Sequence, residues 1–414
     1  MTKNIKKQVY IIGAGPAGLI ASIFAAREGA LVTIIESNPG PGRKLLLTGG
    51  RRCNLTHHAE PSQLIKLYGK GGKFLSYCIY KYSPDYVCDF FAQLGVKTKI
   101  EPDGCIFPTS YKADDVNNAL ISEAKRLKVK FIYNKPVYDI IQEKDGFLIQ
   151  TKEERFSAEK VIIATGGISW PQTGSTGDGY RFAKKLGHSI IEPKASLVPL
   201  ITREEWTSRL AGTSIANMKI STNLDNKKIA TQGAGVFTHN GLGGPAAQDM
   251  SRYLTDFLPA RKKPVEITLD LVPDLRIEEF ENQIIKLADE NPKKKIDNLL
   301  ADFLPKRVVA VVCDLAGCND DVQAGQLKKE IRKKIVQTIK AMQFSVIRTR
   351  PIEEATVTRG GVNLTEINSK TMESKICPGL YLAGEVIDAD GPCGGYSLQI
   401  CWSTGALAGS CAAI

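Results

Sequence analysis

The N-terminal part of the chain begins with two short apolar runs separated by an alanine-rich stretch. Residues 8–12 read QVYII and residues 31–35 read LVTII, whereas residues 16–27 read PAGLIASIFAAR. A short, fully apolar run is typical of a strand that is buried on both faces, and the stretch between two such runs is typical of a crossover helix. The pattern therefore predicts a strand–helix–strand unit.

Helical and strand patterns continue to alternate up to about residue 190. Ser83 followed by Pro84 is a helix start signal, because serine caps a helix and proline suits its first position. Short β-rich runs follow, namely KFIY, VYDIIQ, GFLIQ and KVIIATGG. The last of them predicts a buried strand that breaks at Thr165-Gly166-Gly167. The expected helices lie near 61–80, 84–94 and 112–127.

The pattern then changes twice before it returns. From about 190 to 270 it is β-like, and from about 274 to 342 it is helical. The run LKKEIRKKIVQTIKAM places Leu327, Ile331, Ile335, Ile339 and Met342 on one helical face, which we interpret as core. From about 355, strand-like runs and an apolar helix beginning near Ser397 suggest a return to the first domain. The predicted division is 1–190, 191–272 with 343–354 as a candidate continuation, 273–342, and 355–414.

Composition sets limits on this picture. A chain of 414 residues is long enough for two or three domains, and 43% apolar with 24% charged residues is ordinary for a soluble protein. The sequence contains no apolar run of membrane-spanning length and no signal peptide, so we expect a cytoplasmic protein without a membrane partner. Most of the ten cysteines are then expected to be reduced, and none of them shows a metal-ligand spacing.

The net charge of +11 is concentrated near the N-terminus. Residues 1–135 hold 20 Lys and Arg against 10 Asp and Glu, an excess of ten. Part of this excess lies beside the glycine-rich segments and suits a phosphate-bearing ligand. The rest is either a solvated basic surface or a nucleic-acid footprint, and the sequence leaves both interpretations open.

The turn Gly13-Ala14-Gly15-Pro16-Ala17-Gly18 carries the clearest chemistry. Its first glycine allows a tight bend, its second lets the backbone approach a pyrophosphate, and its third lets the helix pack close to the strand. The helix N-terminus favours an anion, and Glu36 at the end of the second strand is placed to accept a hydrogen bond from a ribose hydroxyl. We therefore predict dinucleotide binding.

Three further segments favour FAD over NAD. They are Thr48-Gly49-Gly50-Arg51-Arg52-Cys53-Asn54, Ala164-Thr165-Gly166-Gly167, and the C-terminal pair Gly384–Asp388 and Gly394–Gln399. FAD is long and needs contacts beyond the first unit, and a late helix N-terminus stabilises negative charge on a reduced flavin. With only one glycine fingerprint, NAD(P)H is expected as a transient electron donor.

The motifs GRKLLLTGGRRCN, VIIATGG, GVFTHNGLGGP, TMESKICPGLYLAGEVIDADG and GGYSLQ resemble those of the bacterial BaiN/RdsA family of FAD-dependent oxidoreductases, from about residue 8 to residue 410. That family includes aminoacetone-oxidase-like and ribosomal RNA dihydrouridine synthase members. The resemblance implies an α/β fold: a Rossmann-like FAD-binding domain interrupted by a β-barrel-like domain and a small helical domain. The chain departs from the family at Arg51, Gly243 and Ser397, where the family usually has Gly, Ser and Asn. We expect Ser397 still to cap the last helix.

The predicted cofactor contacts come from these motifs. Arg43 and Lys44 are expected to contact the ribose or the phosphates. The full set is Gly13, Gly15, Pro16, Ala17, Gly18, Glu36, Ser37, Arg43, Lys44, Thr48, Gly49, Arg52, Cys53, Asn54, Val137, Ala164, Thr165, Gly166, Gly384, Glu385, Asp388, Gly395, Tyr396, Ser397 and Leu398.

Two residues are candidates for catalysis. Cys53 follows two arginines that would lower its pKa and make it a thiolate or a proton donor; the alternative is a buried packing residue. His239 lies beside a glycine turn and would act as an acid or base, although a lone histidine is more often structural.

Other residues near these motifs have plainer interpretations. Tyr396 either stacks near the flavin or simply packs. His57 and His58 are expected at the surface, and Trp170 with Pro171 is expected to close the cofactor edge or to lie in the core.

Three functions remain open from the sequence. The first is NAD(P)H-driven reduction of a C=C bond, with uridine in ribosomal RNA as one candidate substrate. The second is oxidation of a small amine or amino-ketone such as aminoacetone by O₂. The third is a non-catalytic RNA-binding flavoprotein. The partner is thus a small molecule or ribosomal RNA, and the sequence does not indicate an oligomeric state.

Overall fold

The computed structural model describes residues 7–258 and 263–414, which form two compact units. The first unit comprises residues 1–195 and 352–414, and the second comprises 196–351. The chain therefore leaves the first unit five residues later than the predicted boundary at 190 and returns at 352, near the predicted 355.

The first unit is built on a parallel sheet with the strand order β19-β10-β1-β2-β6. Every neighbouring pair runs parallel, so the carboxyl ends of the strands meet at one edge, where nucleotide cofactors bind in folds of this kind. The predicted strand–helix–strand unit is the centre of this sheet. The strands are β1 (Gln8–Ile12), β2 (Leu31–Ile35), β6 (Lys130–Ile132), β10 (Lys160–Ile163) and β19 (Leu380–Leu382).

Two helices that are far apart in the sequence pack against each other so closely that their backbones are in contact. They are α1 (Pro16–Arg27) and α13 (Tyr396–Ala412). A Cβ atom at Gly405 would lie 2.5 Å from the carbonyl oxygen of Ala17, and one at Gly409 would lie 2.2 Å from that of Ala21. Because both contacts advance by four residues, the two helices are parallel and in fixed register.

This register offsets the two helix N-termini. Ala17 is the second residue of α1, whereas Gly405 is the tenth residue of α13. The start of α13 thus projects eight residues beyond the start of α1, or about 12 Å at 1.5 Å per residue. The fold presents two helix N-termini in line, separated by roughly that length.

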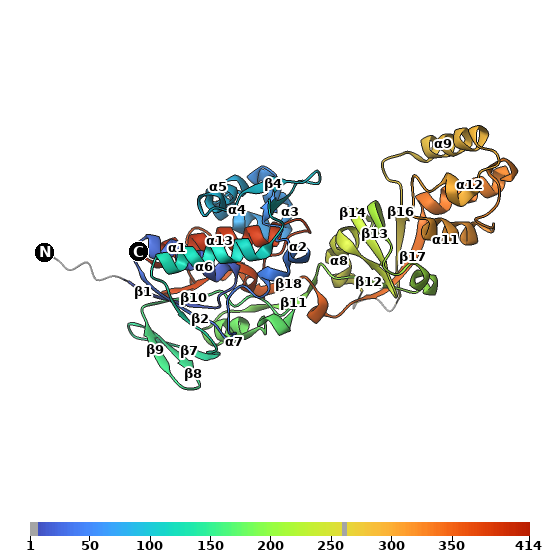
Figure 1. The fold of residues 1–414 in the computed structure, drawn as a ribbon. Helices are drawn as coiled ribbons and strands as arrows, with labels where there is room; N and C mark the ends of the chain where they lie inside the picture. Colours follow the sequence, from blue (N-terminus) through green and yellow to red (C-terminus); the bar gives the residue numbers. More distant parts are fainter. Residues whose placement is uncertain (1–6, 259–262) are drawn as a thin grey trace. The chain divides into compact units, whose positions relative to one another are not determined.

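Smaller elements complete the first unit (Figure 1). The helices α3 to α5 gather on one side of the layer formed by α1, α6 and α13, and the sheet β7-β8-β9 lies on the opposite side. Ser83 Oγ accepts a hydrogen bond from the Tyr86 backbone N–H at 3.2 Å and Pro84 begins α5, so the predicted start signal is confirmed. The helices are α2 (Thr48–Arg51), α3 (Pro61–Leu67), α4 (Gly72–Lys81), α5 (Pro84–Gln93), α6 (Ala113–Arg126) and α7 (Asp178–Lys185); the strands are β3 (Thr56–His57), β4 (Thr98–Ile100), β5 (Cys105–Pro108), β7 (Val137–Glu143), β8 (Gly146–Thr151), β9 (Arg155–Ala158), β11 (Ile190–Ser196) and β18 (Val357–Val362).

The second unit is a closed β-barrel with the strand order β12-β15-β14-β13-β16-β17, followed in space by a group of helices (Figure 1). The strand after the helices, β17, closes the barrel and covers the first part of 343–354, the candidate continuation of the β-like domain. The strands are β12 (Leu200–Thr202), β13 (Ser214–Leu224), β14 (Lys227–Thr238), β15 (Gly241–Gly243), β16 (Val265–Asp270) and β17 (Met342–Thr349); the helices are α8 (Gly244–Phe257), α9 (Ile277–Glu290), α10 (Ile296–Leu299), α11 (Lys306–Ala316) and α12 (Lys329–Lys340).

The predicted apolar stripe needs a correction at both ends. Ile335 and Ile339 are fully buried on α12, as expected, and Ile331 is partly buried against the same core. Leu327, however, precedes the helix, and Met342 is the first residue of β17. The apolar pattern continues across a helix–strand boundary because both elements face one core. The predicted fold class, an α/β Rossmann-like domain with a barrel and a helical insert, is confirmed.

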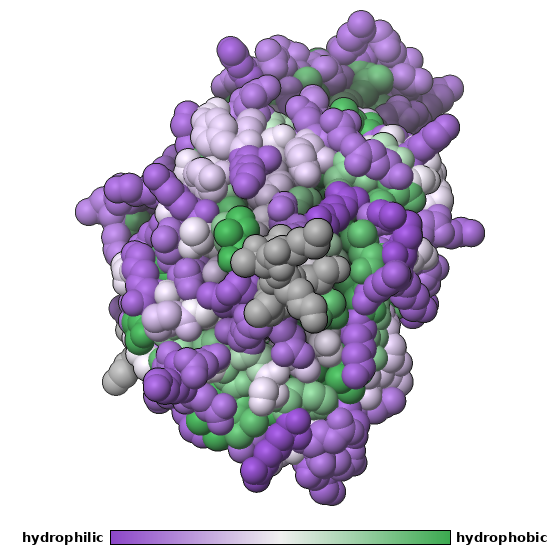
Figure 2. Space-filling model, turned by 90° about the vertical axis from the view of Figure 1, so that its left-hand side faces the viewer, coloured by the Kyte–Doolittle hydropathy of each residue, from purple (hydrophilic) through white to green (hydrophobic). Residues whose placement is uncertain are grey.

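The surface and the helix lengths add two observations. Figure 2 shows one face of the molecule, on which hydrophilic residues cover most of the area and hydrophobic residues form smaller groups between them. Across residues 7–258 and 263–414, each helix is either too short or too polar to cross a membrane.

A buried histidine ties the start of β11 to the C-terminal return. His188 Nδ1 lies 3.0 Å from Glu366 Oε2, and its Nε2 lies 2.8 Å from Ser374 Oγ. The order of groups is that of an acid–base–nucleophile triad, but His188 and Ser374 are only 3% and 5% exposed, so no substrate reaches them. Burial lowers the pKa of His188, and the Glu366 carboxylate only partly offsets this effect. The trio is therefore a structural clamp built on a neutral imidazole.

The contact between α1 and α13 predicts a strong effect of one added methyl group. We expect Gly409→Ala to lower the free energy of unfolding by about 2 kcal/mol, because the new Cβ meets a backbone carbonyl that has no room to move. Urea denaturation measures this difference. Gly40→Ala is the control, since its Cβ would meet no atom within 4 Å, and equal stability of the two variants would contradict the contact.

The His188 clamp predicts a pH dependence. Because the pKa of His188 is lower in the folded than in the unfolded protein, the unfolded chain binds more protons, and stability falls as the pH drops below the ordinary histidine value of about 6.5. We expect His188→Gln to lose part of the fall in unfolding free energy between about pH 7 and pH 5.5. The exposed His58, changed to Gln, should keep the full fall; an identical pH slope in both variants would contradict the assignment.

Candidate functional site

The three glycines of the turn between β1 and α1 have different surroundings. Gly13 has a φ of +102°, and its Cβ would lie 2.6 Å from the Ala164 carbonyl oxygen. The Cβ of Gly18 would lie 2.0 Å from the Gly13 carbonyl oxygen. Gly15, in contrast, would meet no protein atom within 4 Å. The first and third glycines thus serve the packing of the protein, whereas the second faces open space and leaves the backbone accessible to a ligand.

The N-terminus of α1 is prepared for an anion. Its cap residue is Gly15, which has no side chain to satisfy the first N–H groups, Pro16 occupies the first position, and no acidic residue lies in the first turn. Gly384, from the C-terminal return, approaches the same turn: with a φ of +78°, its Cβ would lie 2.7 Å from the Cβ of Ala17. Unpaired N–H groups and close backbone at a helix start form an anion site, here for a pyrophosphate.

Glu36 is held rigidly beside this turn. It is 7% exposed, and its Oε2 accepts a hydrogen bond from the Ala14 N–H at 2.7 Å. Its Oε1 accepts from the Asn38 N–H at 2.8 Å, from Asn38 Nδ2 at 2.7 Å and from Ser37 Oγ at 3.2 Å. Oε2 accepts one hydrogen bond from the described residues and therefore retains a lone pair for a ribose hydroxyl.

Arg43 and Lys44, both expected at the cofactor, are already engaged by the protein. Arg43 donates to Asn38 Oδ1 at 2.7 Å. Lys44 Nζ lies 2.9 Å from Glu385 Oε2 and donates to Ser169 Oγ at 2.7 Å. The side chains of Lys44 and Glu385 are 21% and 15% exposed, so this ion pair is mostly shielded from solvent.

Two buried hydroxyl residues, Ser169 and Thr358, complete this ion pair. Glu385 Oε1 accepts hydrogen bonds from Ser169 Oγ at 3.0 Å and from the Thr358 N–H at 2.6 Å. Thr358 Oγ1 accepts from the backbone N–H groups of Ile168 and Ser169 at 2.9 and 3.1 Å. Sequence reasoning missed both residues, because no local pattern marks them. The fold brings them together with Lys44 and Glu385 from four separate segments of the chain. We call Lys44, Ser169, Thr358 and Glu385 the four-segment network.

The loop 48–54 has an unusual backbone. Gly49, Gly50, Arg51 and Cys53 all have a positive φ, between 56° and 68°. Only glycine adopts this region without steric cost. The loop is fixed at its far end: Trp402 Nε1 donates to the Leu55 carbonyl at 2.8 Å, and Thr56 Oγ1 donates to Gln399 Oε1 at 2.5 Å.

The predicted reactivity of Cys53 is wrong. Cys53 has no exposed surface, and burial raises its pKa to about 12, with only a small opposing effect of a hydrogen bond to Thr48. The two arginines do not counter this: Arg51 is exposed, and the Arg52 guanidinium lies over the Phe107 ring at 4.7 Å. A neutral thiol with no exposed surface does not act as a thiolate, which favours the alternative of a buried packing residue.

The start of α13 differs from expectation at Ser397. Gly395, with a φ of 93°, is the cap residue, and Ser397 lies inside the first turn, so the expected capping role is wrong. Ser397 Oγ is buried without a hydrogen-bond partner among the described residues, as is Thr165 Oγ1 after β10. Buried hydroxyls normally have partners, so these two unpaired groups are candidates for contact with a ligand.

His57 is also placed differently from the prediction. It is half-buried and not a surface residue: its ring stacks on Tyr396 at 4.8 Å, and its Nδ1 lies 3.2 Å from the Gly394 carbonyl oxygen. Tyr396 is 5% exposed and also packs edge-on against Tyr68. Burial lowers the pKa of His57, so a neutral imidazole lies beside the start of α13. His58 is exposed, as expected.

The other predicted residues are scattered around the same edge of the sheet. Ala164, Thr165 and Gly166 follow β10, and Asn54, with its amide turned to satisfy its neighbours, accepts a hydrogen bond from the Gly395 N–H at 3.3 Å. Asp388 is half-buried, and burial raises its pKa. Val137 lies buried in β7, and Leu398 is buried in α13. His239 is exposed in the second unit, directly after β14, and its catalytic role stays a prediction.

These observations fit FAD. A bare backbone at Gly15, a ribose acceptor at Glu36 and two unpaired buried hydroxyls lie in segments that surround two helix N-termini. A diphosphate at the start of α1 and a flavin toward the start of α13 match the offset of about 12 Å. The residues present therefore suit an extended flavin dinucleotide.

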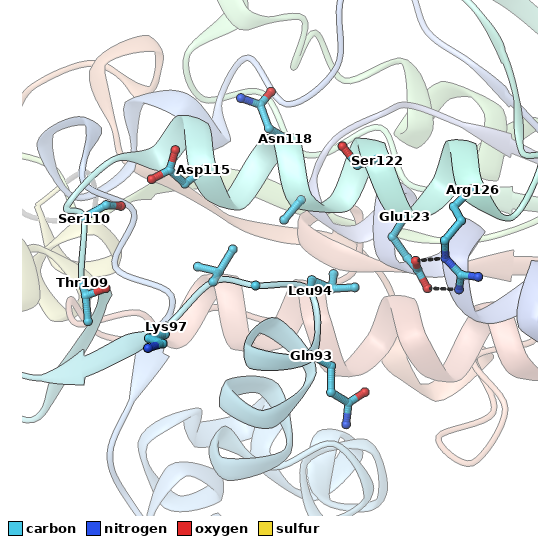
Figure 3. A pocket seen from close by; sticks show the side chains of 13 residues that line it. Gln93, Leu94, Lys97, Thr109, Ser110, Asp115, Asn118, Ser122, Glu123 and Arg126 are labelled. Atoms are coloured by element: carbon cyan, nitrogen blue, oxygen red, sulfur yellow. Dashed lines mark hydrogen bonds and ion pairs between the residues drawn. The ribbon is translucent and has the colours of Figure 1, made fainter.

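The structure also contains a separate cavity of ≈ 670 Å³ that includes none of the predicted site residues. It lies between α6 and the turn after α5 (Figure 3). Glu123 at its end is held by Arg126 and Arg27 at 2.7 and 2.8 Å, and these hydrogen bonds lower the pKa of Glu123 to about 2. A carboxylate neutralised in this way has no free charge to offer a ligand.

Comparison with known proteins places the whole chain. A family model described as "HI0933-like protein Rossmann domain" matches residues 7–411. A 3-dehydro-bile acid delta(4,6)-reductase of Clostridium scindens is 31% identical over 409 residues, covering 98% of this chain and 99% of its own length. A ribosomal RNA dihydrouridine synthase of Escherichia coli is 31% identical over 399 residues, covering 95% of each chain.

A solved structure shows the same fold. The 3-ketosteroid-delta4-(5alpha)-dehydrogenase of Rhodococcus jostii, in complex with 4-androstene-3,17-dione, superposes with a TM-score of 0.54 at 17% identity. The match covers 100% of this chain and 99% of the dehydrogenase. At this identity the likeness concerns the fold alone.

The glycine turn predicts opposite effects for two neighbouring substitutions. Gly15→Ala should leave the unfolding free energy of the FAD-free protein unchanged within about 0.5 kcal/mol and weaken FAD binding by about tenfold or more, because the new methyl fills ligand space. Gly18→Ala should cost about 2 kcal/mol of stability, since its Cβ meets the Gly13 carbonyl. Urea denaturation and flavin titration separate the two effects; a stable Gly18→Ala protein, or undiminished FAD affinity of Gly15→Ala, would contradict this division.

Proposed function

The chain belongs to the HI0933-like family of Rossmann-domain proteins and is an FAD-dependent oxidoreductase, and from this premise we propose that it reduces a C=C bond with electrons from NAD(P)H. The observation that supports the flavin as the site of this reaction is the pair of parallel helices α1 and α13, and the names of the relatives support its reductive direction. The uncapped N-termini of the two helices lie in line, offset by about 12 Å, at the edge of the sheet where cofactors bind.

The residues of the chain divide the work of holding FAD. The N-terminal turn of α1 and Gly15 would bind the diphosphate, and Glu36 would accept a ribose hydroxyl at Oε2. The start of α13 would favour negative charge on the reduced ring, since its N–H groups have no side-chain cap. FAD supplies hydride transfer when it is bound, and the protein supplies orientation and electrostatics.

We propose that the nicotinamide donor binds only transiently. The sequence has one glycine fingerprint, and that turn is the one assigned to FAD. A second dinucleotide would therefore approach the flavin only for the transfer and then leave. This arrangement supports a donor whose binding is transient.

The substrate proposal follows from the names of the relatives and from charge. One relative is named a delta(4,6)-reductase and another a ribosomal RNA dihydrouridine synthase, and both names support a reductive reaction. The excess of ten positive charges in residues 1–135 is compatible with a polyanionic substrate. Uridine in ribosomal RNA is therefore the first substrate to test.

The proposal predicts a coloured protein that nicotinamides bleach. Gently purified protein should be yellow and should lose its flavin colour with NADH or NADPH in the absence of oxygen. Absorbance spectroscopy measures the loss, and the FAD-stripped protein is the control. A strain without the protein should lack dihydrouridine at one ribosomal RNA position by mass analysis if RNA is the substrate.

Two alternative outcomes would overturn the reductase. Bleaching by aminoacetone, with hydrogen peroxide formed in air and no nicotinamide requirement, would make the protein an amine oxidase. Salt-sensitive RNA binding with no flavin reduction by any donor would make it a non-catalytic flavoprotein.

A further inference from the structure

Arg51 occupies a backbone position that favours glycine. It follows Gly49 and Gly50, and the three residues have φ values of 56°, 67° and 68°. Glycine reaches this left-handed region without cost, but a side chain there crowds the following carbonyl. Strain of this kind persists where the surrounding structure or a function requires it.

Among residues 7–258 and 263–414, no contact explains why an arginine stands at this position. The Arg51 side chain is exposed, and in the described part of the chain it has no hydrogen bond, ion pair or aromatic partner. The neighbouring cations are all engaged: Arg43 with Asn38, Lys44 with Glu385, and Arg52 over the ring of Phe107. Arg51 therefore differs from these three cations, because its guanidinium has no partner among the described residues.

The space beside Arg51 is open, and the loop is fixed to the proposed flavin site. Gly49 and Gly50 are exposed, and a Cβ at Gly50 would meet no atom within 4 Å. Three residues after Arg51, the Asn54 amide oxygen accepts a hydrogen bond from the Gly395 N–H, the cap of α13. The free guanidinium therefore stands on a loop that is anchored at the start of this helix.

We propose that Arg51 is a specificity-determining residue that binds an anionic group of the substrate, a carboxylate or a phosphate, at the rim of the reaction site. This inference rests on the proposed function, because it takes the start of α13 as the place of reaction. A guanidinium matches both anions with two parallel hydrogen bonds, and an unpaired one has no internal partner to lose. The backbone strain is then retained for recognition.

The test compares four proteins with FAD bound: the wild type, Arg51→Gly, Arg51→Lys and Lys128→Gly. Lys128 is a matched control, since it is also exposed, has a φ of 63°, and lies in the turn after α6. Calorimetric titration at constant ionic strength with inorganic phosphate and, separately, with acetate measures anion binding. Thermal denaturation and flavin release are measured in parallel.

We expect Arg51→Gly to weaken anion binding by about tenfold or more and to raise the melting temperature by about 2–4 °C, because strain is relieved while recognition is lost. Arg51→Lys should weaken binding less. Lys128→Gly should raise the melting temperature without changing anion affinity. A response to phosphate alone or to acetate alone supports the proposal and identifies the anionic group.

Three results would overturn it. They are unchanged anion affinity in Arg51→Gly, equal weakening in Lys128→Gly, and a loss of FAD rather than anion affinity in Arg51→Gly, which would assign the residue to the cofactor. The proposed function fails separately, if neither NADH nor NADPH reduces the flavin of the FAD-loaded wild type; calorimetry with the same FAD-loaded proteins still reports on Arg51 in that case.

Discussion

The close contact between α1 and α13 is the constraint on which the rest of the site depends. Gly405 and Gly409 let the last helix lie on the carbonyl oxygens of Ala17 and Ala21, at separations that exclude any side chain. Backbone contacts of this kind permit no sliding, because each carbonyl would meet a Cβ one residue away. The contact therefore fixes both the direction and the register of the two helices. The backbone of a helix favours an anion at its N-terminus, so fixing the register also fixes the distance between two positions that favour negative charge.

The four-segment network performs the corresponding task for the loops. Lys44 and Glu385 are 341 residues apart in sequence, and their ion pair is completed by the Ser169 hydroxyl and the Thr358 backbone N–H, both of which donate to Glu385. A shielded ion pair costs desolvation, which it recovers only with good geometry and further hydrogen bonds. Here each oxygen of Glu385 is satisfied, and the loops after β2, β10 and β19 are held at the same edge of the sheet. The network therefore contributes more to the positions of these three loops than to the stability of the fold. On the proposed function, the loops together surround a ligand that no single loop would bind.

The sequence was sufficient where the relevant interactions are local, and it failed where they are long-range. In the unit from β1 to Glu36, the apolar runs, the glycines and the acid follow one another at characteristic spacings. Its strands, turn, helix and acid were therefore predictable one by one. The start of α5 at Ser83 and Pro84 was predictable for the same reason. By contrast, the pKa of Cys53 depends on burial by distant segments, which outweighs the charge of the two adjacent arginines. His57 becomes half-buried only because Tyr396, 339 residues later, packs against it. Ser397 misses the cap position by two residues, a shift that helix-start signals do not resolve.

The contact between α1 and α13 and the four-segment network make one part of the site rigid, whereas the loop 48–52 is free to vary in sequence. The helix pair and Glu36 are buried, and the four-segment network is mostly shielded from solvent, so on the proposed function a change there would disturb cofactor binding as a whole. The loop 48–52 is exposed and strained, and its side chains contribute little to the core. On the proposed function, a substitution in this loop would change the surroundings of the reacting centre without moving α1 or α13. A fold organised in this way can keep one redox chemistry while the exposed loop adapts to different substrates, and the proposed role of Arg51 is one instance of that separation.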